Sequence, residues 1–362
     1  MNTFAFMIHP LDISDFARKF GLLGKLPPRL LEGLFKYSPP IKVSKITGVY
    51  SEHALAEGWF VACPITARLM MELPEQYVMG KIIQAGKLAQ RMGAKILGLG
   101  AFTSVVGDAG ITVAKNLDIA VTTGNSYTVA TAVEGTREAA RLMGHDLKRC
   151  HAVVVGATGS IGQVCARMLA RDVRSLTLVA RQKKRLEDLA HKIMYETGVA
   201  ARITSDIQQA LRDAQIVITV TSAVDTIIGP EDLMPGAVVC DVSRPRNVSK
   251  QVAEKRRDVL VIEGGVVEVP GKVNFNFNFG FPAGTSYACM AETMMLAMEG
   301  RYENFTLGRD LSLAQVEQIS ALAGKHGFRL AGFRSFERAV SPEEIVRIRE
   351  RARAKLALPK AR

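Results

Sequence analysis

The sequence contains few cysteines, few aromatic residues and no long apolar run. Its five cysteines are scattered, and none forms a CxxC pair or lies near a spaced histidine cluster, so we expect neither a disulfide framework nor a metal site. No stretch reaches the ~18 consecutive apolar residues of a membrane-spanning helix, and residues 1–9 lack the pattern of a secretory signal. Aromatic residues make up 6% of the chain and form no recognition motif for nucleic acid. These absences favour a reduced, cytoplasmic protein that does not bind nucleic acid.

The sequence is rich in apolar residues and carries an excess of positive charge. The chain has 362 residues, of which 48% are apolar, and this is enough for two globular domains and a short additional segment. Its 47 basic and 35 acidic residues give a net charge of +12. Such a surplus attracts anions, for example a phosphorylated cofactor, anionic lipid or an acidic protein, although an ordinary solvated surface explains the charge equally well.

Strands and helices alternate through most of the chain. In residues 146–284, short strands rich in valine and isoleucine alternate with helices, a pattern typical of a parallel sheet that is buried on both faces. We therefore expect an α/β protein of three parts. These are an N-terminal α/β substrate domain at 1–145, a doubly wound Rossmann-type NADP-binding domain at 146–284, and a C-terminal helical segment with a basic tail at 285–362.

The strongest single motif is Val153-Val-Val-Gly156-Ala-Thr-Gly159-Ser-Ile-Gly162, in which an apolar strand turns through glycines into a helix. Glycines let a pyrophosphate approach the backbone, and the N–H groups at the helix N-terminus bind its charge. A tight turn without a ligand is the alternative, which the strand-turn-helix context disfavours. We assign cofactor contacts to Gly156, Ala157, Thr158, Gly159, Ser160, Ile161 and Gly162.

The type of cofactor is indicated where the next strand ends, at Arg181. NAD-binding proteins place a carboxylate there for the ribose 2′-hydroxyl, whereas this chain has a guanidinium that suits a 2′-phosphate. The expected cofactor is therefore NADPH. The basic run Lys183–Arg185 has the alternative interpretation of an exposed first helical turn, an unusual place for cations. Thr221 and Ser222, at the end of a later apolar strand, complete the assigned cofactor contacts.

Cys289 is the candidate reactive group. It lies in the first turn of a helix predicted over Ser286–Met298, one position off the apolar stripe expected there. A helix N-terminus lowers the pKa of a thiol and favours the nucleophilic thiolate. The alternative is a buried cysteine that packs as a small apolar residue. That is our interpretation of the other four, Cys63, Cys150, Cys165 and Cys240.

Seven short segments carry a resemblance to a known family. They are Gly100–Ser104, Thr122–Ser126, Val155–Gly162, Val179–Arg181, Gly264–Glu268, Ala288–Glu292 and Lys325–Phe328. In this combination, over roughly residues 4–333, the chain resembles the long-chain acyl-(acyl-carrier-protein) reductases of cyanobacteria, which reduce fatty acyl thioesters to aldehydes with NADPH. The resemblance implies that Cys289 is the catalytic cysteine.

The resemblance also implies a reaction and its partners. The chain would reduce a long-chain fatty acyl thioester, on acyl carrier protein or on CoA, to the fatty aldehyde through a covalent acyl-enzyme at Cys289. An acidic acyl carrier protein would be attracted by the positive charge of the chain. The segment Phe275–Thr285 and the tail after Ser335 depart from the family pattern, and the first of these is a candidate wall of the acyl pocket.

Two other functions stay open. A shikimate/quinate dehydrogenase-like, NADP-dependent reductase of a small polar substrate would share the arrangement of an α/β domain followed by a nucleotide domain, and it would not use Cys289. A non-catalytic NADP(H)-binding sensor would bind the cofactor without turnover.

The tail contains a predicted helix, Ser341–Leu356, that opens with a capping box. One face of this helix is apolar and arginines cover much of the rest, the apolar residues being Ile345, Ile348, Ala352 and Leu356. Such a helix is a candidate contact for a carrier protein or for the surface of a membrane. The alternative is that it packs on its own domain.

Overall fold

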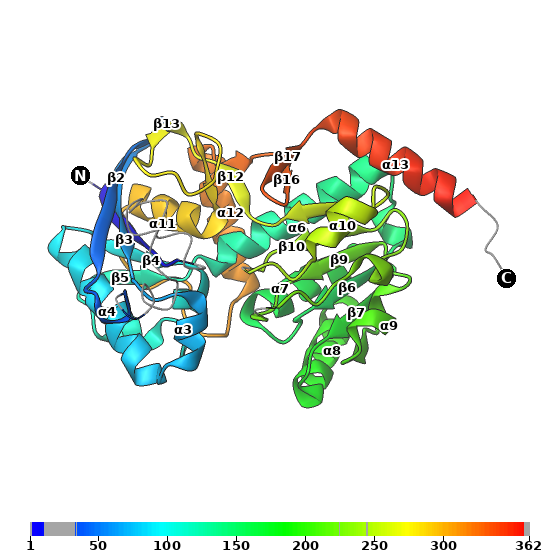
Figure 1. Ribbon diagram of the computed structural model, residues 1–362, viewed down its shortest axis with the longest axis horizontal. Coiled ribbons are helices and arrows are strands. Elements are labelled where there is room, and N and C mark those ends of the chain that lie inside the picture. Colours follow the sequence, from blue (N-terminus) through cyan, green and yellow to red (C-terminus); the bar gives the residue numbers. More distant parts are fainter. Residues whose placement is uncertain (1, 11–32, 34, 224, 244, 358–362) are drawn as a thin grey trace. The chain divides into compact units, whose positions relative to one another are not determined.

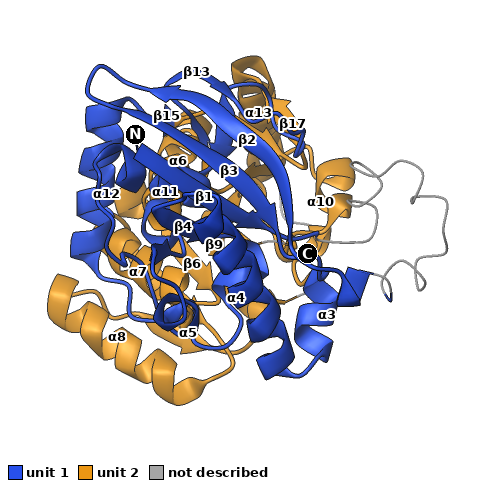
Figure 2. Cartoon of the chain, turned by 90° about the vertical axis from the view of Figure 1, so that its left-hand side faces the viewer, with its two compact units in different colours: residues 1–127, 267–329 blue, residues 128–266, 330–362 orange. Residues whose placement is uncertain are grey.

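The computed structural model describes residues 2–10, 33, 35–223, 225–243 and 245–357. The chain forms two compact units, coloured separately in Figure 2. Unit 1 comprises residues 1–127 and 267–329, and unit 2 comprises residues 128–266 and 330–362. Each unit is built on its own six-stranded sheet.

These units differ from the ranges expected from the sequence, 1–145, 146–284 and 285–362. Most of helix α6 (Asn125–Met143) belongs to unit 2, where the Cys240 thiol donates to the Ala132 carbonyl at 3.8 Å. The C-terminal segment does not form a separate part. Its first helix, α11 (Ala288–Met298), packs on strands of unit 1, and its last helix, α13 (Pro342–Ala357), packs within unit 2.

The sheet of unit 1 is mixed. Its strand order is β13-β2-β3-β1-β4-β5, with the bounds Gly271–Asn274, Ile41–Tyr50, Leu55–Ala62, Asn2–Ile8, Ile96–Leu99 and Ala120–Thr122. Strands β3, β1, β4 and β5 run parallel, whereas β2 and β13 are antiparallel to their neighbours. Figure 1 shows these strands in blue and cyan, with β13 in yellow.

Alternation along β1 divides the core of unit 1 between the two faces of the sheet. Ala5 and Met7 belong to the apolar cluster that includes helix α4 (Glu75–Arg91), together with α3 (Ala67–Glu72) and α5 (Ile111–Lys115). Phe4 and Phe6 point to the other face, where a side chain on Gly98 would collide with Thr293 of α11. Helix α12 (Leu313–His326) packs against α11. The candidate cysteine is therefore carried by a helix laid on a sheet.

The sheet of unit 2 has the strand order β11-β10-β9-β6-β7-β8, which is that of the doubly wound dinucleotide-binding fold. All its pairings are parallel. The strands span Leu260–Glu263, Val238–Asp241, Ile216–Thr219, His151–Val155, Ser175–Val179 and Arg202–Thr204, and the connecting helices α7 to α10 span Ser160–Ala170, Lys183–Thr197, Ile207–Leu211 and Lys250–Lys255. The predicted Rossmann-type fold is confirmed.

Short strands complete the fold. A three-stranded sheet, β14-β12-β15 (Thr285–Tyr287, Val266–Glu268 and Arg329–Leu330), forms where the chain passes from one unit to the other. Strands β16 (Phe333–Ser335) and β17 (Arg338–Val340) form an antiparallel hairpin before the tail helix. Among the described helices, none is long and apolar enough to cross a membrane.

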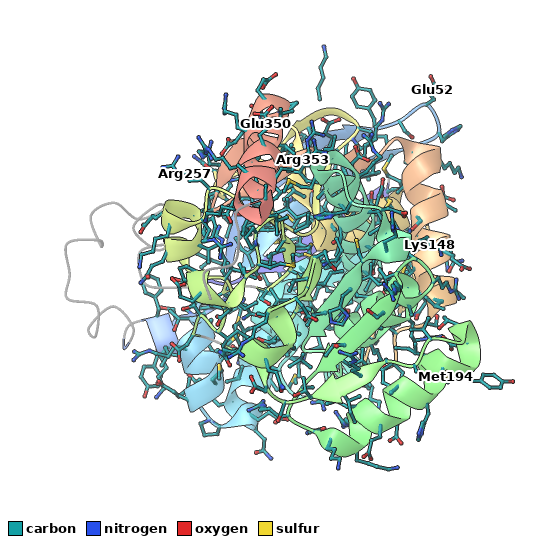
Figure 3. The ribbon with its side chains drawn as sticks, turned by 90° about the vertical axis from the view of Figure 1, so that its right-hand side faces the viewer. Glu52, Lys148, Met194, Arg257, Glu350 and Arg353 are labelled. Atoms are coloured by element: carbon teal, nitrogen blue, oxygen red, sulfur yellow. The ribbon has the colours of Figure 1, made fainter. Side chains whose placement is uncertain are left out.

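The tail helix α13 packs on its own unit, as the second interpretation of its sequence proposed. Ile345, Ile348 and Ala352 are buried, whereas Leu356 is 57% exposed. Arg349 donates to the Leu142 carbonyl at 3.1 Å, and Lys355 pairs with Asp258 at 3.2 Å. Figure 3 labels Glu350 and Arg353, two of its exposed charged residues. Most of the apolar face of α13 is therefore buried within unit 2.

Candidate active site

The predicted glycine turn lies between β6 and α7 of unit 2. Gly156 has φ +82°, and a Cβ there would lie 2.3 Å from the Val220 carbonyl oxygen. A Cβ on Gly162 would lie 2.2 Å from the Gly156 oxygen. Distances this short are not tolerated, so the protein's own packing requires glycine at both positions.

Gly159 differs from these two glycines. It is exposed, and the nearest atom to a Cβ at this position would be the Gly156 oxygen at 3.4 Å, an ordinary contact. Gly159 is also the N-cap of the eleven-residue helix α7 and provides no side-chain cap. The space beside the helix N-terminus is what a pyrophosphate needs to reach the backbone. The residues of this turn therefore fit a dinucleotide cofactor.

The remaining turn residues have different surroundings. Ala157 is buried, and its N–H donates to the Val179 carbonyl at 3.1 Å, as does that of Gly156 at 2.9 Å. Ala157 therefore shapes the turn through its packing and its internal hydrogen bond. The other assigned residues are half-buried, Thr158 in the turn and Ser160 and Ile161 at the start of α7.

Arg181 lies directly after β7 and before Gln182, the N-cap of helix α8, and its side chain is exposed. It thus occupies the end of the second strand of the nucleotide fold, where a 2′-phosphate is bound in NADP proteins. The next two cations have partners one helical turn on. Lys184 pairs with Asp188 at 3.0 Å, and Lys183 is 3.9 Å from Glu187.

Thr221 lies two residues beyond β9 and is held by a polar network. The Asn247 Oδ1 atom accepts from the hydroxyls of Thr219, Thr221 and Ser243 at 2.8, 2.9 and 2.6 Å. Thr221 also donates its N–H to Ser243 Oγ at 3.0 Å. Ser222, by contrast, is exposed. This network positions the loop that carries Thr221 and Ser222 at the carboxyl edge of the sheet.

Sequence reasoning missed the second half of this network. Asp241, the last residue of β10, accepts from the N–H groups of Ser243 and Val248, each at 3.0 Å. Asp241 is 1% exposed and Asn247 is fully buried. The available signal was the cluster of polar residues directly after an apolar strand, because that is the edge where nucleotide folds bind their ligands.

Cys289 differs from the other four cysteines in its exposure. Cys63, Cys150, Cys165 and Cys240 are buried, whereas Cys289 is half-buried. Burial raises the pKa of Cys63 to about 12 and that of Cys150 to about 11, and it also raises the pKa of Cys165. Thiols of this kind stay protonated and inert. Cys289 is therefore the cysteine whose surroundings allow a reaction.

Helix α11 begins two residues later than predicted, because Ser286 belongs to strand β14 and Tyr287 is the N-cap. Cys289 is the second residue of the helix, within its first turn as expected. The prediction of a single apolar stripe was wrong: Glu292 and Thr293, expected on the polar side, are fully buried. The helix packs on the sheet with one side and against other segments of unit 1 with the rest.

A glycine holds the backbone of another segment against Cys289. Gly124 lies between β5 and α6 with φ +74°, and a Cβ there would lie 2.3 Å from both Cα and Cβ of Cys289. Only glycine permits this approach. The segment Thr122–Ser126 and the segment around Cys289, both singled out in the sequence, are thereby brought together.

Glu292 joins the same two segments. Its carboxylate accepts from the hydroxyls of Thr122 and Ser126, each at 2.5 Å, from that of Thr306 at 2.8 Å, and from the Tyr127 N–H at 2.9 Å. The side chain has no exposed surface, so these four donors compensate for burying its charge. Glu292 therefore fixes helix α11 to the loop that covers Cys289, a role that sequence reasoning did not assign.

One family of known proteins matches part of this chain. The family described as shikimate/quinate 5-dehydrogenase matches residues 137–263, which lie within unit 2. The match therefore covers the nucleotide fold with its glycine turn, Arg181 and the network around Asn247. It does not include Cys289.

Three curated relatives extend the similarity. An aminotransferase, PigE, of a Serratia species is 29% identical over 96% of this chain and 42% of its own length. A long-chain acyl-(acyl-carrier-protein) reductase of Synechococcus elongatus is 27% identical over 81% of this chain and 88% of its own length. A glutamyl-tRNA reductase of a Roseiflexus species is 28% identical over 51% of this chain and 43% of its own length.

The chain thus spans less than half the length of two of these three relatives. The similarity to the acyl-(acyl-carrier-protein) reductase noted in the sequence is supported, because it extends over most of both chains. The family and two of the three relatives are named as dehydrogenases or reductases, which supports the general class of an NADP-dependent oxidoreductase.

Proposed function

We propose that this chain is an NADPH-dependent reductase that converts a long-chain fatty acyl thioester, on acyl carrier protein or on CoA, to the fatty aldehyde through an acyl-enzyme at Cys289. The observation that carries the proposal is the environment of this cysteine. It is half-buried in the first turn of α11 beneath Gly124, while the other four cysteines are buried. A thiol at a helix N-terminus is poised to act as a nucleophile.

The first chemical step belongs to Cys289. Its thiolate attacks the carbonyl carbon of the thioester, and the carrier thiolate leaves and takes up a proton, so that one thioester replaces another at little cost. Backbone N–H groups at the start of α11 are suitable donors for the oxyanion formed in this attack. The acyl group is then held on the enzyme while its carrier departs.

The second step reduces the acyl-enzyme. NADPH, when bound, supplies a hydride for the carbonyl carbon, and the Cys289 thiolate is the leaving group that frees the aldehyde. Overall, one acyl thioester, one NADPH and one proton give one aldehyde, one carrier thiol and one NADP⁺. Gly159 and the first turn of α7 hold the pyrophosphate in this proposal, and Arg181 holds the 2′-phosphate.

The named activities of the relatives support this class of reaction. One relative is named for the reduction of an acyl group on a carrier protein and another for the reduction of a glutamyl group on tRNA. Both names describe an acyl group that is attached to a carrier. The reductase of Synechococcus elongatus is also the one of the three relatives that the chain covers over most of its length. The aminotransferase name belongs to a protein of which the chain covers 42%.

The partner in this proposal is an acidic acyl carrier protein. The net charge of +12 favours encounter with an acidic protein. Helix α13 uses Ile345, Ile348 and Ala352 to pack on unit 2, so insertion of this face into a membrane is disfavoured. Its exposed arginines remain available for electrostatic contact.

The proposal is tested by mixing the purified chain with NADPH and palmitoyl thioester, on acyl carrier protein or on CoA. We expect one hexadecanal for each NADPH oxidised. Oxidation of shikimate or quinate with NADP⁺, without turnover of any thioester, would favour the dehydrogenase-like alternative. Binding of NADPH without turnover of any of these substrates would favour the sensor.

A further inference from the structure

The loop between β13 and β14 arranges aromatic side chains in a connected row. The row consists of Phe60 on β3 and five residues of the loop and the strand after it, Phe275, Phe277, Phe279, Phe281 and Tyr287. Ring centroids of successive members lie 5.6 Å apart for Phe60 and Phe279, 5.4 Å for Phe279 and Phe281, and 4.4 Å for Phe281 and Tyr287. These are the separations of packed aromatic pairs.

The asparagines that alternate with these phenylalanines fold the loop. The side-chain oxygen of Asn274 accepts from the Asn276 N–H at 2.8 Å, and that of Asn278 accepts from the Gly280 N–H at 2.8 Å. The Asn276 amide donates to the Lys45 carbonyl of β2 at 3.0 Å. All three asparagines are exposed, so the polar side chains face water and the rings gather on the other side of the loop.

The row is only partly covered by the protein. Phe60 and Phe275 are buried, whereas Phe277, Phe279 and Phe281 are half-buried. The row ends at Tyr287, which is also half-buried and is the N-cap of helix α11, two residues before Cys289. An apolar surface therefore runs along the loop to the residue that opens the cysteine helix.

We propose that this aromatic row is the binding subsite for the alkyl chain of the acyl group that Cys289 accepts. The inference rests on the proposed function for the identity of the acyl group. The loop from Asn274 to Phe281 carries no charged side chain, and rings that lead to Tyr287, the N-cap of the cysteine helix, suit a flexible hydrocarbon tail. A second copy of the chain could cover an apolar surface anywhere on the protein, whereas this row ends at Tyr287, two residues before Cys289 in the sequence. The alkyl chain is therefore the occupant that we favour.

The first test does not depend on catalysis. Cys289 is the cysteine that is not buried, so the rate at which a maleimide labels it can be followed by mass spectrometry. We expect N-octylmaleimide to label Cys289 at least about tenfold faster than N-ethylmaleimide, because the longer chain gains from apolar contact. Phe279→Ala and Phe281→Ala should each reduce this preference, with the rate of N-ethylmaleimide unchanged.

The matched control is Tyr195→Ala, which removes an aromatic side chain that is 93% exposed in unit 2. It should leave the preference intact. Phe279→Leu keeps most of the apolar volume and should retain most of the preference for N-octylmaleimide. This variant allows the preference to be measured even if the alanine variant does not fold. Equal labelling rates for the two maleimides in the unaltered chain would overturn the alkyl subsite.

A second measurement separates this inference from the proposed function. With palmitoyl and butyryl thioesters as substrates, Phe279→Ala should lower kcat/KM about tenfold for palmitoyl and leave butyryl nearly unchanged. Equal losses for both substrates would overturn the subsite while the reductase activity stands. A preference for N-octylmaleimide without aldehyde from any thioester would support the subsite and overturn the proposed function. A dimer that Phe279→Ala dissociates, with equal maleimide rates, would assign the row to an interface between copies.

Discussion

Gly124 and Gly159 each follow a parallel strand and precede or begin a helix, one in each unit. A Cβ on Gly124 would overlap the backbone of Cys289, at 2.3 Å, whereas a Cβ on Gly159 would meet nothing closer than 3.4 Å. The first glycine lets two parts of the protein pack together. The second leaves space at a helix N-terminus that the described residues do not fill. Of these two glycines before helices, one therefore serves an internal contact and the other leaves room beside a helix N-terminus, where we propose that the pyrophosphate binds.

The loops that carry these two glycines differ in the same respect, because one is closed by contacts within its unit and the other is open. In unit 1 the loop after β5 is closed down on α11 by Gly124 and by the four hydrogen bonds of Glu292. In unit 2 the turn after β6 is open, and Arg181 is exposed beside it in the fold. We infer that unit 1 provides the reactive group and that unit 2 binds the cofactor.

The largest effect is expected from Cys289→Ser. The change is nearly isosteric, so folding and NADPH binding should persist, but aldehyde formation should fall by at least about a thousandfold, mainly in kcat. A serine hydroxyl is a weak nucleophile at neutral pH, and any ester formed would be a poorer hydride acceptor than a thioester. Aldehyde release under saturating thioester and NADPH is the measurement.

The same substitution at the four buried cysteines is the control. Variants of Cys63, Cys150, Cys165 or Cys240 that fold should retain most activity. If Cys289→Ser turned over normally while one of these folded variants did not, the nucleophile would be wrongly assigned.

The next effect compares the two glycines directly. Gly124→Ala should lower the free energy of unfolding by about 2–4 kcal/mol, because it adds a backbone overlap to an unfavourable positive φ. Gly159→Ala should change stability by less than about 0.5 kcal/mol but weaken NADPH binding about tenfold, since the Cβ occupies the space of the pyrophosphate. Urea unfolding and cofactor titration on both variants check the pair, and equal destabilisation would remove the distinction.

Arg181→Ala should weaken NADPH binding by about tenfold to a hundredfold, the loss of one charge-assisted contact to phosphate. NADH binding should change much less, because NADH has no 2′-phosphate. Fluorescence titration of both cofactors on the variant tests this, and Lys184→Ala, whose side chain pairs with Asp188, is the matched control. Equal losses for NADPH and NADH would contradict the assignment.

The smallest expected effect is that of Glu292→Gln. An amide keeps one acceptor oxygen but presents an NH₂ group to surrounding donors, which should cost about 1–2 kcal/mol of unfolding free energy. The variant should also be labelled faster at Cys289 by N-ethylmaleimide than the unaltered chain, because the loop that covers this cysteine is less firmly held. Urea unfolding and the labelling rate are the two measurements, and no change in either would show that the four hydrogen bonds do not fix the loop.

Much of unit 2 could be predicted from the sequence because its signals are local. The glycine turn after an apolar strand, Arg181 at the end of the next one, and valine-rich strands between helices are all read within short windows. The position of Cys289 in a first helical turn was also predictable, from the proline and glycine just before it. Such local patterns predict the fold well because a parallel sheet buries both faces of each strand, so that each strand shows the same apolar pattern.

The rest depends on contacts between distant segments. The donors to Glu292 come from Thr122, Ser126, Tyr127 and Thr306, so nothing near Glu292 in the sequence reveals that its charge is buried. The domain boundary was misplaced because α6 continues without interruption from unit 1 into unit 2. Helix α11 has apolar, small and polar residues around its whole circumference, and only the packing shows which are covered.

The central claim is that Cys289 carries the acyl group, and mass spectrometry tests it most directly. The chain is mixed with palmitoyl thioester in the absence of NADPH, digested and mapped. We predict one palmitoyl group on the peptide that contains Cys289, which disappears as hexadecanal forms when NADPH is added. Aldehyde formation with NADPH but without any adduct, or an adduct confined to another cysteine, would contradict the account.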